Sequence, residues 1–503
     1  MNPLHRAALA AAAGTCLSLA APQALAAPST AETELRAQVQ QQSEQLRQQG
    51  ALLDALNARL AALEHAGATA GSVPAVTAQG TAMPVADPFQ AQVAAAIADT
   101  RQDDMAILQA QAAQLAATGG GGGGGNVLWR KGGPEFRSSD GQFSFHPRGR
   151  VLVDFSSTHG SGFPTRNITG TDLASGRLGA EGQMGALGYK IDADFAGNEI
   201  SLKDTYLSWD TRLGDLPTEV YIGNKLKDRS LDGGTSGTNT PFMSRNAVAS
   251  VGAQQSGHYG LGITTKVIGD GWHASLAVTG DDIGNASTAS DTIAYLLRAH
   301  WNPLRGKDGF VHLGGWYWYE DLGNDVTSIN KTSPLALGWN GNVRVSASSI
   351  ANVTDNHAWG LELGGVYRSV WAFAEHTTRT IESRTVDAVD QKATSVYTGW
   401  LITGERPGFS SRSGVWGTTR VLRPVQDGGI GAFELAARYD RYDYLDAARG
   451  GEGTAWTVGL NWYLNNWSRL MLNYVHWKTD NKVGNFQGPD SGNTVGVRAQ
   501  VSF

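Results

Sequence analysis

A cluster of basic side chains lies in a long connection between two predicted strands, at residues 225–257. The net charge of this connection is positive, because it holds four basic residues, Lys225, Lys227, Arg229 and Arg245, and two acidic ones, Asp228 and Asp232. In a narrow water-filled opening, cations without a competing negative partner replace part of the hydration that an anion loses. The chemistry that this pattern favours is therefore the electrostatic selection of small anions.

Histidines offer a second chemistry, a nucleophile and base pair of the kind that hydrolases use. The candidates are His146, His273, His300, His312 and Ser275. They match no recognisable catalytic motif, and histidines of strand walls are more often hydrogen-bonded structural residues. The His, Asp and Glu residues also lack the dense spacing that binds metals. We therefore expect no enzyme activity, no metal and no cofactor.

The segments that carry these residues alternate apolar and polar side chains, as strands do when successive residues turn to opposite faces. In YKIDADF at 189–195, the apolar residues alternate with Lys190, Asp192 and Asp194. The closing stretch NTVGVRAQVSF at 493–503 has one apolar face and one polar face that holds Arg498. Such segments recur about sixteen times, near residues 148, 176, 188, 202, 219, 258, 272, 291, 309, 357, 370, 394, 430, 454, 468 and 493.

Composition agrees with many strands joined by tight turns. The 503 residues include 64 Gly, 15 Trp, 14 Tyr and 14 Phe, but one Cys and 17% charged residues. Such a mixture suits turns and amphipathic rings better than a helical enzyme. The formal net charge is −6, and we expect no nucleic-acid partner.

Two architectures fit the amphipathic strands, a soluble sandwich and a closed membrane barrel. Three features favour the barrel: a predicted export signal at residues 1–26, long connections that alternate with short ones, and aromatic residues at the ends of the strands. These aromatic residues are Trp209, Trp272, Trp301, Trp316, Tyr319, Trp400, Trp462 and Trp477. No segment after the first 26 residues has the roughly 20 apolar residues of a membrane helix, so a barrel is the remaining spanning structure. The predicted fold is all-β, an antiparallel transmembrane β-barrel of about sixteen strands over 126–503.

The first 125 residues predict a signal and a stalk. Residues 1–26 resemble a secretory signal peptide, with Arg6, an Ala/Leu-rich core and a small-x-small site before position 27. Residues 27–66 carry a 4,3 repeat from Leu35 to Leu63, which favours an oligomeric α-helical coiled coil over a helix folded on the main domain. Residues 67–125 are predicted to be a flexible linker with one short helix and seven consecutive glycines.

Several stretches of the body together resemble the phosphate-selective porin O/P family of bacterial outer membranes. They are GRLGAEG (176–182), IDADFAGNEISLKDTYLSW (191–209), YIGNKLK (221–227), FMSR (242–245), YTGWLITGE (397–405), GAFELAARYDRYD (431–443) and GLNWYLNNWSRLMLNYV (459–475). The resemblance implies a trimer of sixteen-stranded barrels, each with an inward third loop at 224–257 that forms a constriction. It also assigns Lys225, Lys227 and Arg245 to family positions. The coiled coil is similar to that of family relatives that take up dicarboxylates.

Further candidates for selecting solutes come from the polar faces of the strands. The candidates on this face are Arg150, Arg177, Lys190, Lys266, Arg298, Arg368, Arg438 and Arg498. Each of them is at least as well explained as half of a wall ion pair with a neighbouring carboxylate. Phe503 resembles the terminal aromatic residue by which outer-membrane barrels are recognised for assembly.

The function that these observations favour is passive diffusion of small anionic solutes, phosphate or small organic anions, through an outer-membrane porin. The expected partners are lipid, the solute, and further copies of the chain that meet through barrel walls and coiled coil in a homotrimer. The alternative is a general, weakly selective porin whose periplasmic stalk tethers the outer membrane to peptidoglycan. One sequence leaves the identity of the solute open.

Overall fold

The computed structural model describes residues 126–503, apart from 131, 282, 284–290 and 338. The predicted signal peptide, coiled coil and linker, at 1–26, 27–66 and 67–125, lie outside the described residues and stay predictions. Among the described residues, no helix is long and apolar enough to cross a membrane.

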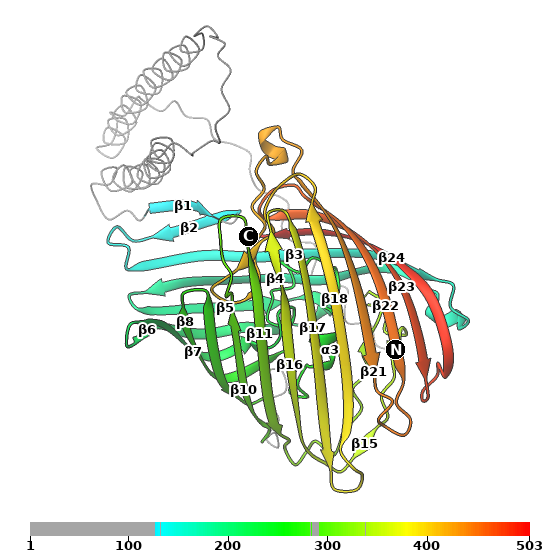
Figure 1. Ribbon diagram of the computed structural model, residues 1–503. Coiled ribbons are helices and arrows are strands. Elements are labelled where there is room, and N and C mark those ends of the chain that lie inside the picture. Colours follow the sequence, from blue (N-terminus) through cyan, green and yellow to red (C-terminus); the bar gives the residue numbers. More distant parts are fainter. Residues whose placement is uncertain (1–125, 131, 282, 284–290, 338) are drawn as a thin grey trace, which may run out of the picture. The chain divides into compact units, whose positions relative to one another are not determined.

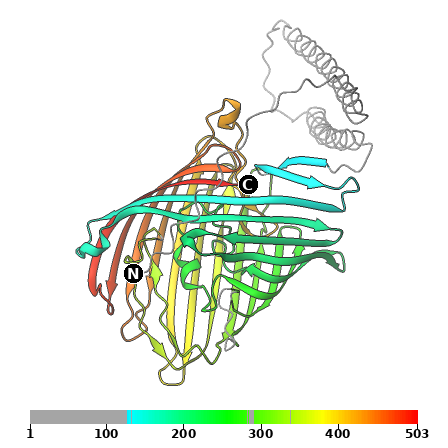
Figure 2. The same ribbon diagram turned by 180° about the vertical axis from the view of Figure 1, so that it is seen from behind.

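The described chain forms a closed antiparallel β-barrel (Figures 1 and 2). Two of the 18 strands in its sheet, β1 (Asn126–Arg130) and β2 (Gly133–Arg137), form a hairpin beside the start of β3. The wall strands are β3 (Phe143–His159), β4 (Thr169–Met184), β5 (Leu187–Asp194), β6 (Ser201–Leu213), β7 (Leu216–Leu226), β8 (Tyr259–Gly269), β9 (Trp272–Thr279), β10 (Ile293–Trp301), β11 (Gly309–Asp321), β16 (Val353–Tyr367), β17 (Val370–Ser383), β18 (Val389–Leu401), β21 (Ala432–Asp443), β22 (Glu452–Tyr463), β23 (Ser468–Asn481) and β24 (Gly488–Ser502). Strand β24 pairs with β3, which closes the wall, so that each of these sixteen described wall strands has a neighbour on both sides. The sixteen strands of this described wall agree with the predicted number.

The two-residue alternation of the sequence decides which side chains enter the barrel. In β10, Tyr295 and Leu297 are 50% and 52% exposed on the outside, whereas Arg298 and His300 are buried inside. In β24, Val497 and Val501 face outward and Arg498 faces inward. The predicted apolar and polar faces are thus confirmed for these strands.

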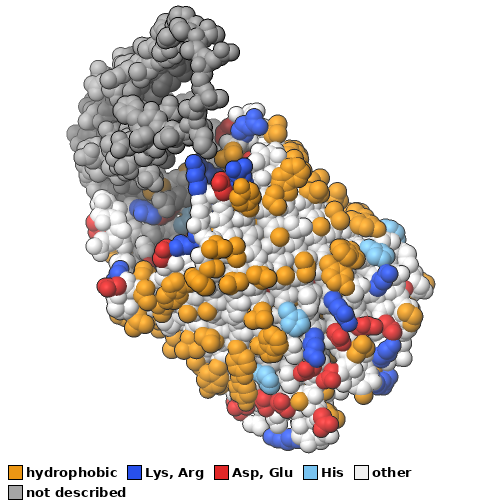
Figure 3. Space-filling model, viewed as in Figure 1, with side chains coloured by type: hydrophobic (Ala, Val, Ile, Leu, Met, Phe, Trp, Pro, Cys, Tyr) orange, Lys and Arg blue, Asp and Glu red, His pale blue; other side chains and the backbone are white. Residues whose placement is uncertain are grey.

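The outer surface carries rows of hydrophobic side chains along the strands, which Figure 3 shows on one face. Among the predicted girdle residues, Trp209, Trp301 and Trp400 lie on this outside, since each is about half exposed or more. Trp316 and Trp477 are corrections to that prediction. Both are buried, because each belongs to the inward face of its strand and packs in the interior.

Connections differ strongly in length between the two ends of the barrel. At one end, β6 and β7 are joined by Gly214 and Asp215, and β8 and β9 by Asp270 and Gly271. At the other end, residues 227–258 and 322–352 form the longest connections. The connection from β18 to β21, residues 402–431, is also long although it belongs to the end with the short turns and the C-terminus (Figure 1). Short turns of such barrels face the periplasm.

Packed side chains fill part of the interior. One cluster joins Val248 of helix α3 (Ala247–Val251) to Trp318 of β11 and Trp477 of β23. A second cluster joins Phe373 of β17 to Trp416, whose rings lie 5.2 Å apart. A polar cavity of the interior is lined instead mainly by residues of β3 to β6 and of the 227–258 connection.

Candidate functional site

The connection between β7 and β8, residues 227–258, folds into the barrel interior. The resemblance implied such an inward loop at 224–257, and we call residues 227–258 the constriction loop. Its short helix α3 packs against β17, β18 and β21. Asn246 caps α3, because its side-chain oxygen accepts a hydrogen bond of 2.8 Å from the Ala249 N–H.

Wall carboxylates hold the constriction loop by its backbone. Glu375 of β17 accepts a hydrogen bond of 2.9 Å from the Leu231 N–H. Asp440 of β21 accepts one of 3.0 Å from the Ala247 N–H. Other wall side chains that bond to the loop backbone are Glu320, Asn461, Arg469, Asn473 and Gln500. Because buried backbone groups must be paired, these side chains fix the path of the loop.

Two further segments enter the interior. The 402–431 connection carries the strands β19 (Phe409–Ser410) and β20 (Val415–Trp416), and we call it the short-end plug. The N–H of Trp416 donates a hydrogen bond of 3.1 Å to Thr235 Oγ1 of the constriction loop. In the 322–352 connection, β13 (Ser333–Pro334) pairs with β14 (Arg344–Val345). All three segments narrow the open space.

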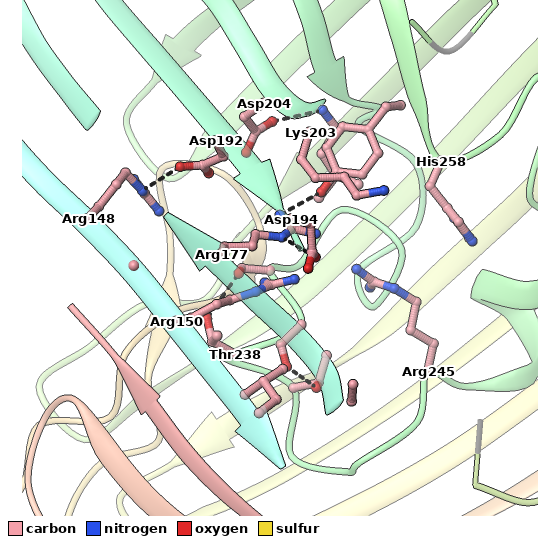
Figure 4. Close-up of a pocket in the computed structure, with 18 of the residues that line it drawn as sticks. Arg148, Arg150, Arg177, Asp192, Asp194, Lys203, Asp204, Thr238, Arg245 and His258 are labelled. Atoms are coloured by element: carbon pink, nitrogen blue, oxygen red, sulfur yellow. Dashed lines mark hydrogen bonds and ion pairs between the residues drawn. The ribbon is translucent and has the colours of Figure 1, made fainter. Parts of the chain in front are cut away.

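Two adjoining cavities remain beside β3 and β4, each of about 480 Å³. Five residues line both of them, so the cavities meet there: Ala174, Met243, Arg245, His258 and Arg498. The first cavity continues along Arg148 and Lys190, and the second along Lys331 and Arg344. Figure 4 shows Arg150 and Arg245 pointing toward one another across the first cavity. We call the two cavities together the basic path.

Most carboxylates that line the basic path are neutralised by a wall cation. The pairs are Asp154 with Arg498 (2.6 Å), Asp192 with Arg148 (3.1 Å), Asp194 with Arg177 (2.8 Å) and Asp204 with Lys190 (2.7 Å). Asp172 is the lining carboxylate that has no ion pair with any described residue. The negative charges along this path are therefore largely cancelled.

Four lining cations have no carboxylate within ion-pair distance in the described part of the chain: Arg150, Arg245, Lys331 and Arg344. Arg150 Nε donates to Ser175 Oγ at 2.8 Å, and Arg344 Nε donates to Thr332 Oγ1 at 2.7 Å. These partners are neutral, so they orient the guanidinium groups without cancelling their charge. The path therefore carries an excess of positive charge.

Burial shifts the protonation of two groups on the path that belong to connections. Burial, followed by the nearby Arg229, lowers the pKa of His258 well below its ordinary value. Burial, followed by Arg379, likewise lowers the pKa of Lys331 well below that of a free lysine. His258 is therefore neutral at neutral pH.

Lys225 and Arg245, two of the predicted selectivity residues, take different positions. The Lys225 ammonium lies 4.9 Å from the centre of the Tyr221 ring, near the end of β7. Arg245 lies where the two cavities meet, and it donates to the backbone oxygens of Asp232 and, at 2.7 Å, Thr235. Among the four cations predicted in the constriction loop and at its start, Arg245 is thus the one that lines both cavities.

Lys227 and Arg229 hold the constriction loop together. Lys227 Nζ donates to Ser256 Oγ at 2.7 Å, and the side chain is 3% exposed. Arg229, which is 1% exposed, donates to the Ala249 carbonyl oxygen at 2.7 Å and contacts His258. The geometry gives both residues a structural role within the loop.

Lys266, Arg298 and Arg438 are buried in ion pairs. Lys266 Nζ lies 2.8 Å from Asp228 Oδ2, and Arg298 lies 3.0 Å from the other oxygen of Asp228. Burial acts to raise the pKa of Asp228, but Lys266 and Arg298 outweigh it and hold this pKa well below the usual value. Arg438 donates to Asp440 at 2.6 Å and to the Ser244 carbonyl oxygen at 2.8 Å.

Arg368 is not part of the interior. Alternation placed it on the polar face of a strand, but β16 ends at Tyr367, and Arg368 forms the turn to β17 with a positive φ of 53°. Its side chain is 66% exposed and lies 3.4 Å from Asp308 of the preceding short turn. The two-residue alternation stops where the strand stops, which is why the assignment of Arg368 to the interior is corrected.

The predicted list of lumen residues omitted several groups that line the basic path. Arg148 shares the parity of Arg150, so alternation alone was sufficient to find it. Lys331 and Arg344 belong to the 322–352 connection, where no periodic pattern indicates which side chains enter the barrel. Local sequence therefore carries the signal for wall residues but not for inward loops.

Phe503 lies at the seam where the barrel closes. Its N–H donates to the Gly149 carbonyl oxygen at 2.9 Å, and its carbonyl oxygen accepts from the Gly149 N–H at 2.8 Å. These two bonds extend the β24–β3 ladder by one residue beyond Ser502. The residue predicted as an assembly signal thus takes part in the last pairing of the wall.

Two proteins are similar to this chain over most of its length. Porin O of Pseudomonas aeruginosa is 27% identical over 434 residues, which cover 79% of this chain and 97% of that protein. An uncharacterized protein of Caulobacter vibrioides is 27% identical over 399 residues, which cover 75% and 77%. Among solved structures, the anion-selective porin of Comamonas acidovorans aligns with 12% identity and a TM-score of 0.43, covering 72% of this chain and all of that one.

The family model described as phosphate-selective porin O and P matches residues 148–503. This range takes in almost the whole barrel wall, from β3 to the last residue. Such a family and a closed barrel are typical of non-enzymatic channels. The chain therefore belongs to the phosphate-selective porin O and P family and is an outer-membrane porin.

Proposed function

We propose that this porin lets small anionic solutes, phosphate or small organic anions, diffuse passively across the outer membrane. The observation that carries the proposal is the charge of the basic path. Four of its cations, Arg150, Arg245, Lys331 and Arg344, have no carboxylate partner among the described residues, whereas most lining carboxylates have a cationic one. Arg245 is the predicted selectivity residue that we assign to direct solute contact.

The physical argument rests on the hydration of the solute. An anion that enters a narrow path loses water, and cations that lack a partner replace part of that hydration. A cation entering the same path meets an excess of like charge, which raises its energy. The path therefore favours anions as a class, and it favours a multiply charged anion more than a singly charged one.

Planar bilayers test this proposal. In a potassium chloride gradient, the reversal potential should have the sign that corresponds to chloride crossing faster than potassium. Phosphate and succinate, added in turn, should then reduce the chloride current, and their relative potency ranks the solute classes. A reversal potential that favours potassium would refute the proposed anion preference.

We further propose that the porin is a homotrimer, which meets through its barrel walls and through the predicted coiled coil at 27–66. The 4,3 repeat supports self-association, because a narrow apolar seam on a helix is best buried by another helix. Chemical cross-linking of the detergent-extracted protein should give a ladder that ends at three copies. A ladder that ends at one or two copies would contradict the trimer.

The stalk supports a second proposed role, a tether between the outer membrane and peptidoglycan. Heptads followed by seven glycines, at 119–125, suit an arm that moves independently of the barrel. Deleting residues 27–125 should then weaken the cell envelope, measured by leakage of periplasmic proteins, without changing the conductance of the barrel. An intact envelope in this deletion strain would contradict the tether.

A further inference from the structure

Arg298 of β10 is a fully buried arginine whose every N–H group is engaged. Its Nε donates to Glu362 at 2.9 Å, and its Nη2 donates to Glu362 and to the Gly414 carbonyl oxygen at 2.8 and 2.7 Å. Its Nη1 donates to Asp228 at 3.0 Å and to the Ser413 carbonyl oxygen at 2.9 Å. A guanidinium has five N–H donors, so none is left for a solute.

The partners of Arg298 belong to three different parts of the molecule. Glu362 lies on the wall strand β16, and Asp228 lies in the constriction loop. Ser413 and Gly414 lie in the short-end plug, which enters the barrel from the opposite end. One side chain therefore joins the constriction loop and the short-end plug to the same wall.

The surroundings of Arg298 reinforce each of these contacts. Asp228 also accepts from Lys266 at 2.8 Å and from Ser275 Oγ at 2.9 Å, and His273 Nε2 lies 3.1 Å from it. His300 Nε2 lies 2.9 Å from the Ser411 carbonyl oxygen of the plug. His273, His300 and Ser275, three of the five residues that suggested a hydrolase, thus contact these two segments.

The tip of the plug is shaped for this contact. Gly414 has a φ of 60°, and a Cβ at this position would lie 2.5 Å from a ring atom of His300. Only glycine combines that backbone angle with such a close approach. The Gly414 carbonyl oxygen can therefore reach the Arg298 guanidinium, which a bulkier residue would prevent.

We propose that Arg298 is a positioning residue that latches the constriction loop and the short-end plug to one wall and thereby sets the width of the pore. The inference concerns pore width and does not depend on the proposed anion preference. Loss of Arg298 should loosen the constriction loop and the short-end plug together. Buried acceptor oxygens on both segments would lose their hydrogen-bond donor, and they would then have to bond to another donor or open toward water.

Hydrogen exchange and conductance test the latch with the variant Arg298→Lys. Lysine keeps the positive charge between Asp228 and Glu362 but has three donors and no planar fork, so it cannot hold the plug carbonyl oxygens as well. Amide exchange should become about tenfold faster or more in peptides that cover 228–235 and 409–416. This is the change expected when one charge-assisted hydrogen bond no longer opposes local opening of the segment. The unit conductance of the folded porin should rise as well.

Arg438→Lys is the matched control, because Arg438 is also a buried wall arginine with a wall carboxylate partner, Asp440, and donates to the constriction loop at Ser244 instead of to the short-end plug. It should raise exchange near Ser244 and leave 409–416 unchanged. If Arg298→Lys does not assemble, the variant Glu362→Gln can replace it, because it weakens the contact between Arg298 and β16 and leaves Arg298 unchanged. The latch would be overturned if exchange became faster in only one of the constriction loop and the short-end plug, or in neither. An unchanged unit conductance would also overturn it.

Discussion

Neutralising Arg245 provides the sharpest test of the proposed anion selectivity. Arg245 lines both cavities of the basic path and has no carboxylate partner among the described residues. Its hydrogen bonds go to backbone oxygens of Asp232 and Thr235, which leave its charge uncancelled. The variant Arg245→Gln removes one full charge at the point where the cavities meet.

Coulomb's law gives the size of the effect. An anion about 4 Å from the guanidinium gains about 1 kcal/mol in bulk-like water and about 4 kcal/mol at an effective dielectric constant of 20. The lower figure corresponds to about a fivefold change in occupancy at room temperature. We therefore expect Arg245→Gln to reduce the ratio of chloride to potassium permeability about fivefold or more.

Reversal potentials in planar bilayers measure this ratio, and salt should be low because the Debye length is about 10 Å at 0.1 M. Arg245→Lys keeps the charge and should stay close to the wild type. Arg305→Gln removes a charge from an exposed short turn, where Arg305 pairs with Asp270 at 2.6 Å, and should change nothing. If Arg245→Lys loses as much selectivity as Arg245→Gln, the effect comes from loop geometry and the electrostatic reasoning is refuted.

Three further predictions concern pH, assembly and stability. Because burial lowers the pKa of Lys331 well below that of a free lysine, Lys331 should lose its charge as the pH rises through this lowered pKa, so anion preference should fall as the pH is raised, and Lys331→Gln should flatten this profile of reversal potential against pH. Deleting Phe503 removes two hydrogen bonds to Gly149 at the seam, so the yield of heat-resistant porin should fall while the conductance of surviving channels stays normal; an unchanged yield would contradict the seam role. Arg498→Leu leaves Asp154 buried without its partner, which should cost about 3–5 kcal/mol in urea unfolding, and adding Asp154→Asn should recover part of that loss.

Much of the barrel wall was predictable because the direction of a strand side chain is a local property. Alternation placed Arg177, Lys190 and Arg498 on the inward side, where the structure shows them lining the path. The same rule failed at Arg368, where the strand ends and a turn begins. A separate rule, which takes aromatic residues near strand ends as outward ones, failed at Trp316, which is buried in the interior.

The interior was less predictable, because long connections carry no period. Lys331 and Arg344 come from a connection that enters the barrel, and nothing in their neighbourhood in the sequence distinguishes them from exposed loop residues. The short-end plug is a similar case, since its length was visible but its entry into the interior was not. Such segments are placed by hydrogen bonds to distant wall strands.

The amino-acid sequence alone determined that this protein is a porin barrel of about sixteen strands, because the two-residue period, the turns and the family motifs are all readable along the chain. The tertiary structure decided which charges remain free to meet a solute. Arg498 is cancelled by Asp154, a residue 344 positions away, whereas Arg245 keeps its charge. Whether a cation is cancelled depends on distances between residues that only the closed barrel brings together, and so the basic path is a property of the fold.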